Sequence, residues 1–313
     1  MQETTEQRSV ALAATDDLIA ESKRAEEWAG EPFLHNGEDP AEVLASETAR
    51  RRALDEALAE IEAGQREPSS QWRVRFALML GLERVLSEKP PRLASGTELR
   101  RHQIDALAGM LTELIAAVQR ADEPLNGNGN GVVEEYEDEE EEEGPEAFED
   151  EEPLPEEPTP EADPGAVRRY RFRHPTASGK TIAAAGFVEA ARTMGVLILT
   201  HRRLLVSQFN RELTAEGYGD RLTPIIERGQ KPPRQDPVTV QTYAWFARHV
   251  DSVDREAYQL VIADEAHTAL GEKTSRAIRS FPEPVYIGMT ATEQLIAKQV
   301  SDVFPASVDD LPL

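Results

Sequence analysis

Hydrophobic positions follow two different patterns, and the pattern changes near the middle of the chain. Between residues 99 and 118, apolar residues recur at i, i+3, i+4 and i+7 spacing, which predicts a helix with one buried face. Residues 1–96 show helical spacing among dense charges, and the apolar run 72–82 is the part best suited to burial. The first third is therefore predicted to be helical, as a small domain, an extension packed on its neighbour, or a dedicated interaction module.

After residue 167, short apolar runs rich in β-branched residues replace this pattern. They alternate with helical patterns at 181–194 and 204–216, which is typical of a parallel sheet covered by helices on both faces. The runs are 170–174, 196–199, 238–240, 260–263 and 285–289. We therefore predict an α/β fold. The ligand site of such a sheet lies at the carboxyl ends of its strands.

The segment between the two regions has a composition of its own. Residues 122–163 contain 20 acidic residues and no basic one, so most of the net charge of −25 belongs to this segment. Its few apolar residues offer too little burial to offset the entropy lost on ordering, and the Asn-Gly repeat at 126–131 is typical of a flexible linker. We therefore predict disorder over 122–166.

Composition also excludes several classes of protein. Cysteine is absent, which excludes disulfides, thiolate metal sites, iron–sulfur clusters and cysteine nucleophiles. The first residues lack the basic and apolar parts of a signal peptide, and no apolar run approaches the roughly 18 residues of a membrane span. We therefore expect a soluble, cytoplasmic protein without a membrane partner.

The first candidate for chemistry is the loop 175–181, Pro-Thr-Ala-Ser-Gly-Lys-Thr, between a predicted strand and a predicted helix. In such loops, backbone N–H groups and the helix N-terminus face a triphosphate, a lysine reaches the β- and γ-phosphates, and a hydroxyl binds Mg²⁺. Lys180 and Thr181 fit the last two roles. The full pattern has Gly or Ala at position 174, where this chain has His174, and Gly-Lys-Thr also occurs in ordinary surface loops.

The second candidate is 261–267, Val-Ile-Ala-Asp-Glu-Ala-His, in which an apolar strand ends in two acids. Asp264 suits an Mg²⁺ partner, and Glu265 can orient and deprotonate an attacking water. The alternative is an ordinary helix N-terminus with acids in its first turn. A phosphate loop followed by an acidic strand end in the same α/β sheet favours an ATP site.

These two segments resemble motifs I and II of a superfamily 2 DEAD/DEAH-box helicase or translocase. Four further segments resemble motifs of this family: the glutamine motif at 99–103, motif Ia at 199–205, motif Ib at 240–243 and motif III at 290–292. The resemblance covers about 97–120 and 168–313. It implies a RecA-like P-loop lobe, the first of the two lobes of a helicase motor.

The resemblance implies roles for individual residues, with ATP and Mg²⁺ as cofactors. Nucleotide binding is implied for Gln103, which would read adenine, and for Thr176, Ala177, Ser178, Gly179, Lys180 and Thr181. Catalysis is implied for Lys180, Asp264 and Glu265, with Mg²⁺ held by Thr181 and Asp264. Coupling of nucleotide state to nucleic acid is implied for His267, Thr290 and Thr292, and contact with the nucleic-acid backbone for Arg202, Arg203, Gln241 and Thr242.

The resemblance also suggests how the chain is organised. We expect a helical region of unknown role at 1–96, a glutamine-motif helix belonging to the ATPase lobe at 97–121, the acidic insertion at 122–166 and the helicase ATP-binding domain at 167–313. A second RecA-like lobe, which supplies arginine fingers in this family, is not found in the sequence. We expect that lobe in cis in a longer product or in trans, and weak ATP hydrolysis by this chain alone.

The expected function is coupling of ATP hydrolysis to DNA unwinding or translocation. DNA is favoured because Asp-Glu-Ala-His with Thr-Ala-Thr is closer to restriction-type helicases and DNA translocases; an RNA helicase or a chromatin-remodeller-like translocase is the alternative. A non-catalytic scaffold that binds nucleotide or nucleic acid and uses its acidic tract for partners is the alternative of another class. The insertion itself is either a negative arm beside the nucleotide site, competing with nucleic acid or recruiting a basic partner, or a solvated tether.

Overall fold

The computed structural model describes residues 3–120, 163–173, 180–290 and 300–308. Six strands form a single sheet in the order β3-β2-β4-β5-β1-β6, and every pairing is parallel. The strands are β1 Arg169–Arg173, β2 Val196–Thr200, β3 Val238–Thr242, β4 Leu260–Asp264, β5 Val285–Thr290 and β6 Ala306–Val308. The predicted α/β fold is confirmed. The sixth strand was not predicted.

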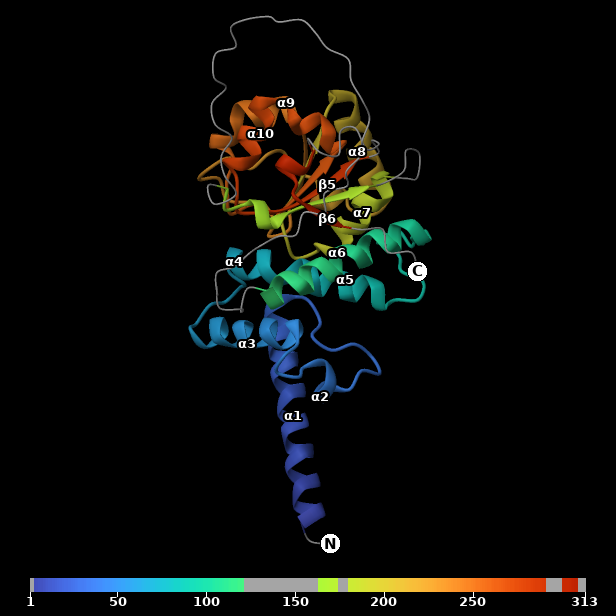
Figure 1. Ribbon diagram of the computed structural model, residues 1–313, viewed down its shortest axis with the longest axis vertical. Coiled ribbons are helices and arrows are strands. Elements are labelled where there is room, and N and C mark those ends of the chain that lie inside the picture. The colour runs from blue at the N-terminus through green and yellow to red at the C-terminus, as the bar shows by residue number, and fades with distance from the viewer. Residues whose placement is uncertain (1–2, 121–162, 174–179, 291–299, 309–313) are drawn as a thin grey trace, which may run out of the picture.

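Helices cover both faces of the sheet, as the alternating pattern predicts (Figure 1). One face packs on α7 and α8, together with α6, and the other packs on α9 and α10. Strands β2, β4 and β5 are buried along their whole length because they lie between these two layers. The helices are α6 Arg101–Arg120, α7 Lys180–Ala190, α8 Arg203–Ala215, α9 Tyr243–His249 and α10 Glu272–Arg279.

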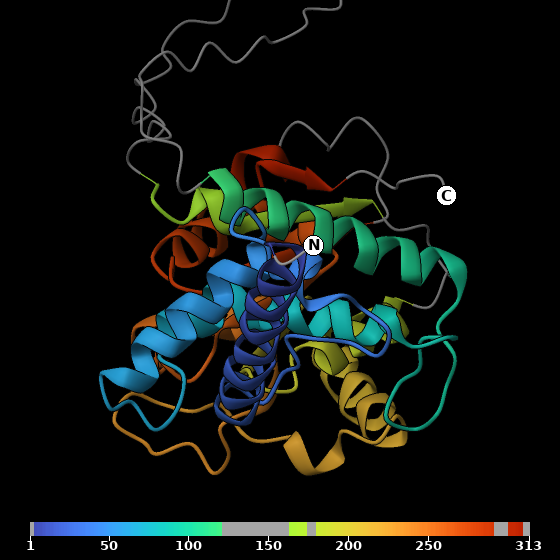
Figure 2. The same cartoon turned by 90° about the horizontal axis from the view of Figure 1, so that it is seen from below.

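The N-terminal region is helical, as predicted. Its helices are α1 Glu3–Ala29, α2 Pro40–Val43, α3 Ala49–Glu62, α4 Ser70–Trp72 and α5 Leu78–Ser87, with a π-helical turn at Arg73–Ala77. Side-chain oxygens of Thr48 and Ser69 begin α3 and α4 by accepting backbone N–H hydrogen bonds. Figures 1 and 2 show α5 and α6 beneath the sheet and α1 projecting away from the body along the long axis.

This helical region packs directly on the α/β lobe. Its buried side chains belong to the same hydrophobic cluster as the face of the sheet that carries α7. The carboxylate of Glu31, which is buried, lies 2.9 Å from Arg84 and 3.0 Å from Arg192, and Arg84 also reaches Glu189 of α7 at 2.9 Å. The packing is therefore that of an extension fixed to the lobe. The boundary at 96/97 stays a prediction, because the core does not divide there.

Disorder was predicted for 122–166, and most of this segment lies outside the described residues, which end at 120 and begin again at 163. At the end of the segment the prediction is wrong. Asp163 is buried and forms an ion pair with the fully buried Arg169 of β1, and a 3₁₀ turn follows at Ala166–Arg168. A buried acid next to a buried arginine fixes the chain here, because separating the pair would leave an uncompensated charge.

Among the described residues, no helix has both the length and the apolar character needed to cross a membrane.

A glycine lies at the contact between the helical region and the lobe. Gly81 of α5 lies against the end of α7, where a Cβ atom on Gly81 would be 1.8 Å from the carbonyl oxygen of Ala190. No real Cβ atom tolerates this distance, and the obstacle is backbone, so the two helices cannot move apart without disturbing the core between them. Glycine at this position therefore sets the separation of α5 and α7.

We predict that Gly81→Ala lowers the free energy of unfolding by about 2 kcal/mol or more, because overpacking at a helix crossing forces backbone shifts. Urea denaturation of the full chain measures the change. Gly271→Ala is the matched control: Gly271 has φ −58° and no atom within 4 Å of an added Cβ, so its effect should stay within about 0.5 kcal/mol. Equal effects of the two substitutions would contradict the packing argument.

Candidate active site

The parallel register brings the predicted site residues to one edge of the sheet. Thr200 at the end of β2 is paired with Thr242 of β3, and Asp264 at the end of β4 is paired with Met289 of β5. Thr290 at the end of β5 is paired with Arg173, the last residue of β1. The carboxyl ends of five strands therefore meet at one edge, which is where an α/β sheet binds its ligand.

The predicted phosphate loop begins at this edge. Strand β1 ends at Arg173 and α7 begins at Lys180, so a strand, a short connection and a helix follow one another as the sequence predicts. Thr176, Ala177, Ser178 and Gly179 lie outside the described residues. The amino-terminal end of α7, where Thr181 is half-buried, presents backbone N–H groups and the positive end of the helix dipole, which favour an anion.

Asp264 is held by two hydrogen bonds from residues on neighbouring elements. Its side chain is only 6% exposed, and its Oδ2 accepts a hydrogen bond from the Thr200 hydroxyl at 3.2 Å. The buried Tyr243 hydroxyl donates to the Asp264 backbone carbonyl at 2.8 Å. Burial, together with the nearby acids, raises the pKa of Tyr243 well above its usual value, so its hydroxyl keeps the proton that it donates. Thr200 and Tyr243 thus fix both the carboxylate and the backbone of Asp264.

Glu265 has a strained backbone. Its φ of 50° and ψ of 57° lie in the left-handed region, and it is the one non-glycine residue with positive φ among the residues that the structure describes. For an L-amino acid with a side chain this costs about 1–2 kcal/mol. The Glu265 carboxylate is partly exposed and lies 3.5 Å from Nδ1 of His267, whereas the preceding residue, Asp264, is buried. Strain of this kind clusters at functional sites, where the neighbouring structure maintains it.

The ordinary alternative, acids that begin a helix, is not what the structure shows. The residues after Glu265 form a 3₁₀ turn, Ala266–Leu270, and the Glu265 side chain does not cap it. An N-cap residue would have extended backbone, whereas Glu265 is left-handed. The Glu265 side chain therefore makes no capping hydrogen bond to this turn.

His267 connects the acidic corner to the end of β5. Its Nδ1 lies 3.2 Å from the Thr290 hydroxyl and 3.5 Å from Oε2 of Glu265. The structure thus brings together two of the predicted coupling residues, His267 and Thr290. The third, Thr292, lies outside the described residues.

The residues predicted to contact nucleic acid lie at the carboxyl ends of β2 and β3. Arg202 and Arg203 are exposed at the start of α8. Gln241 and Thr242 are half-buried at the end of β3, and the Thr242 hydroxyl accepts the Trp245 backbone N–H at 3.2 Å and begins α9. Sequence reasoning missed Leu204, which is 78% exposed beside the two arginines. It also missed Thr200 and Tyr243. Both lie close to the end of a predicted strand, and this position could have identified them as site residues.

Gln103 lies in the first turn of α6, which packs against α7. Its side chain is 1% exposed, and its Oε1 accepts the Arg100 backbone N–H at 2.9 Å, as in the returning half of a capping box. This hydrogen bond helps begin the helix. Recognition of adenine by Gln103 stays a prediction.

The site suits a nucleotide-bound Mg²⁺ better than a metal held by protein alone. In the part of the chain that the structure describes, no group of three or more His, Asp or Glu side chains could hold a metal ion. Magnesium in phosphate-transfer sites typically takes one or two protein oxygens together with phosphate oxygens and water. Asp264, with its carboxylate at the edge where α7 begins, fits this requirement, and Thr181 is the second candidate ligand.

Comparison with known proteins gives a family. Residues 97–295, more than half of the chain, match the family model described as "Type III restriction enzyme, res subunit". No curated protein matches the chain.

Solved structures of helicases and related ATPases are also similar. The helicase domain of Hef from Pyrococcus furiosus is 21% identical over 46% of this chain and 34% of that chain, with a TM-score of 0.36. The UvsW helicase from bacteriophage T4 is 17% identical over 45% of this chain and 54% of that chain, with a TM-score of 0.35. The Sulfolobus solfataricus SWI2/SNF2 ATPase core in complex with dsDNA is 17% identical over 44% of this chain and 30% of that chain, with a TM-score of 0.35. The aligned part thus spans about a third to a half of each of these chains.

We predict that Tyr243→Phe lowers the free energy of unfolding by about 1–2 kcal/mol, because the buried Asp264 carbonyl loses its donor, and also lowers the kcat of the ATP hydrolysis that the sequence predicts. Tyr286→Phe is the matched control, since the buried Tyr286 hydroxyl donates to the Phe281 carbonyl at 2.7 Å, far from this edge. The control should lose similar stability and keep its kcat. A kcat that falls equally in both variants would mean that Tyr243 acts through stability alone.

We predict that Glu265→Gly raises the free energy of unfolding by about 1 kcal/mol, because glycine adopts the left-handed conformation without strain. The control is Glu272→Gly in the first turn of α10, which should lower it by about 0.5–1 kcal/mol. Urea denaturation of both variants gives the two signs. A loss of stability in Glu265→Gly would show that the corner is not strained.

Proposed function

Because the chain belongs to the family of type III restriction enzyme res subunits and contains a superfamily 2 helicase-type ATP-binding domain, we propose that it binds ATP with Mg²⁺ and hydrolyses it when nucleic acid is bound. The observation that carries this proposal is the corner at the end of β4. There, a buried Asp264 held by Thr200 and Tyr243 stands next to a left-handed Glu265, at the edge of the sheet where α7 begins.

In the proposed reaction, the triphosphate lies at the amino-terminal end of α7. Lys180 would offset the charge on the β- and γ-phosphates, and Thr181 and Asp264 would hold Mg²⁺, which would offset further phosphate charge. The rest of the loop, Thr176, Ala177, Ser178 and Gly179, offers backbone N–H groups, and Gln103 contacts the adenine. These roles follow the order of residues along the strand, loop and helix.

Glu265 is the proposed general base. A partly exposed carboxylate that directly follows the proposed metal ligand in sequence can accept a proton from the attacking water, which a fully buried acid could not reach. Transition-state charge in this chemistry is usually stabilised by an arginine as well. We propose that a second RecA-like lobe, in the same or another chain, supplies it, so that hydrolysis is weak without that lobe.

Nucleic acid is proposed to bind across the carboxyl ends of β2 and β3. Arg202 and Arg203 are exposed there, and Gln241 and Thr242 lie on the neighbouring strand. Cations and amides on a sugar–phosphate backbone bind without reading sequence. His267 and Thr290, which are 3.2 Å apart, together with Thr292, would link this surface to the acidic corner.

We propose DNA as the nucleic acid, with movement along it or unwinding as the result of hydrolysis. The support is the pairing of Asp-Glu-Ala-His at 264–267 with Thr-Ala-Thr at 290–292, together with the restriction-enzyme family of the chain. RNA is the alternative that the same backbone contacts would allow.

The test is ATP hydrolysis with and without single- and double-stranded DNA and RNA. We expect Lys180→Ala to abolish ATP binding, and Glu265→Gln to keep ATP binding while lowering kcat by about 100-fold or more, as loss of a general base does. Lys273→Ala and Glu272→Gln, exposed in α10, are the matched controls and should behave as the unaltered chain.

Absence of nucleotide binding by the unaltered chain, or hydrolysis that neither site substitution changes, would contradict the proposal. Binding without turnover, even when a second lobe is added, would favour a non-catalytic scaffold. Stimulation by RNA but not by DNA would reverse the proposed nucleic-acid preference.

A further inference from the structure

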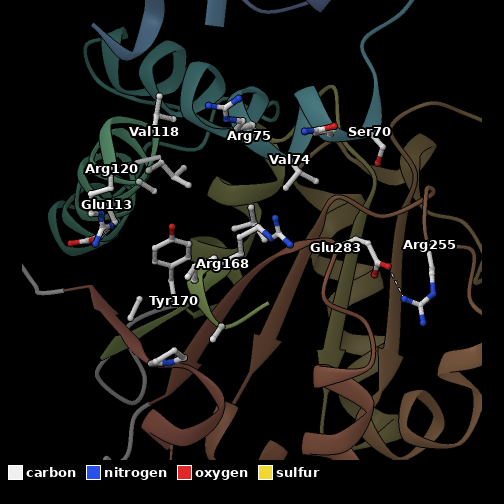
Figure 3. Close-up of a pocket in the computed structure, with 18 of the residues that line it drawn as sticks. Ser70, Val74, Arg75, Glu113, Val118, Arg120, Arg168, Tyr170, Arg255 and Glu283 are labelled. Carbon is white, nitrogen blue, oxygen red and sulfur yellow. Dashed lines mark hydrogen bonds and ion pairs between the residues drawn. The ribbon is translucent and has the colours of Figure 1, made fainter. Parts of the chain in front are cut away.

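A cavity of about 1390 Å³ lies at the edge of the sheet opposite the candidate active site (Figure 3). The amino ends of β1, β5 and β6 line one side of the cavity, and α4, the π-helical turn and α6 line the other side. Apolar side chains come from both sides, with Val74 and Val118 on the helices and Tyr170 and Val285 on the strands. The cavity is therefore an open cleft between the helical extension and the lobe, and the proposed ATP site does not use it.

Both ends of the acidic segment 121–162 are at this cavity. Arg120, the last described residue before the segment, lines one wall, and Ala166–Arg168, just after the segment, line another. Asp163 fixes the returning end through its ion pair with Arg169 and its approach to Arg279 at 3.5 Å. Although the segment was expected beside the nucleotide site, its described ends lie at the amino edge of β1.

The cavity contains one arginine whose charge is not matched by a described acid. Three of its four lining arginines have carboxylate partners: Arg75 pairs with Glu56, Arg120 with Glu113 and Arg255 with Glu283. Arg168 donates to the Pro282 carbonyl at 3.0 Å, forms no ion pair with a described residue, and has a buried Nε without a partner. A partly buried guanidinium with spare donors favours an added carboxylate.

The wall beside Arg168 is apolar and exposed. Val167 is 74% exposed, and among the described residues only Leu204 is a comparably exposed large hydrophobic side chain. An occupant that fits this cavity must therefore bring an apolar side chain to Val167 and a carboxylate to Arg168.

The acidic segment has this combination. Between residues 121 and 162 it contains 19 acids and no base, and Phe148 is followed directly by Glu149 and Asp150. Phe148 is 15 residues before Asp163. An extended chain of this length spans up to about 50 Å, so Phe148 can reach the cavity. A tether this short gives an effective concentration of roughly millimolar, so a weak contact is enough for occupancy.

We propose that the segment around Phe148 binds in this cavity, with Phe148 against Val167 and a neighbouring carboxylate on Arg168. Docking there holds the negative charge at the amino edge of the sheet, away from Arg202 and Arg203 at the opposite edge. The cavity is thus an intramolecular binding site for an acidic, aromatic-containing peptide. This inference does not depend on ATP hydrolysis.

The test uses spin labels on the full chain, which has no cysteine of its own. One pair, Asp150→Cys with Glu256→Cys, reports the distance to the exposed rim of the cavity, and a second, Asp150→Cys with Arg203→Cys, reports the distance to the opposite edge. Pulsed electron paramagnetic resonance should give a short, narrow distribution for the first pair and a longer one for the second.

Two variants decide whether the cavity causes that distribution. Arg168→Glu and, separately, Phe148→Ser should each lower the short-distance population by about threefold or more, since each removes one of the two contacts. Phe148→Ser changes the segment alone, so its effect does not come from misfolding of the cavity. Arg276→Glu, exposed on α10, is the charge-matched control and should change nothing.

A broad distribution for the first pair overturns the proposal, as does a short distance that neither Arg168→Glu nor Phe148→Ser alters. A short distance for the second pair overturns it in favour of an acidic arm that covers the nucleic-acid edge.

Discussion

The parallel pairing of every strand is the constraint on which the rest of the structure depends. Because all six strands run in the same direction, their carboxyl ends share one edge, and the last residues of β1, β2, β3, β4 and β5 meet there although they are far apart in sequence. The same constraint puts all the amino ends at the other edge. One sheet therefore presents two separate surfaces, a proposed ATP and nucleic-acid edge and an open cavity lined by the helical extension.

At the carboxyl edge, the arrangement of the site residues lowers the stability of the fold. The left-handed Glu265 and the buried Asp264 are both unfavourable in isolation, and the hydrogen bonds from Thr200 and Tyr243 offset part of that cost. At the carboxyl end of α7, the helical extension is fixed by the close approach of Gly81 and by the ion pairs of Arg84 with Glu31 and Glu189. The helix that begins at the proposed phosphate loop is thus held at its carboxyl end by a region whose sequence carries no motif.

Local patterns were enough to predict the fold class, five of the six strands and the helix that became α6, because each depends on hydrophobic periodicity within one segment. Strand β6 is three residues long and carries little pattern of its own. The family resemblance implied a shared coupling role for His267 and Thr290, whose side chains lie together in the structure. It could not predict the support from Thr200 and Tyr243, the capping contact of Gln103 or the buried Asp163–Arg169 pair, because these depend on packing between elements.

The central claim is that the carboxyl edge of the sheet binds ATP with Mg²⁺. Hydrogen exchange of the full chain, with and without saturating ATP and Mg²⁺, tests it most directly. The account predicts slower exchange in peptides that cover 174–182, 264–268 and 290, with little change in α1 to α5. Exchange that ATP leaves unchanged at this edge, or protection confined to the helical extension and the cavity, would contradict it.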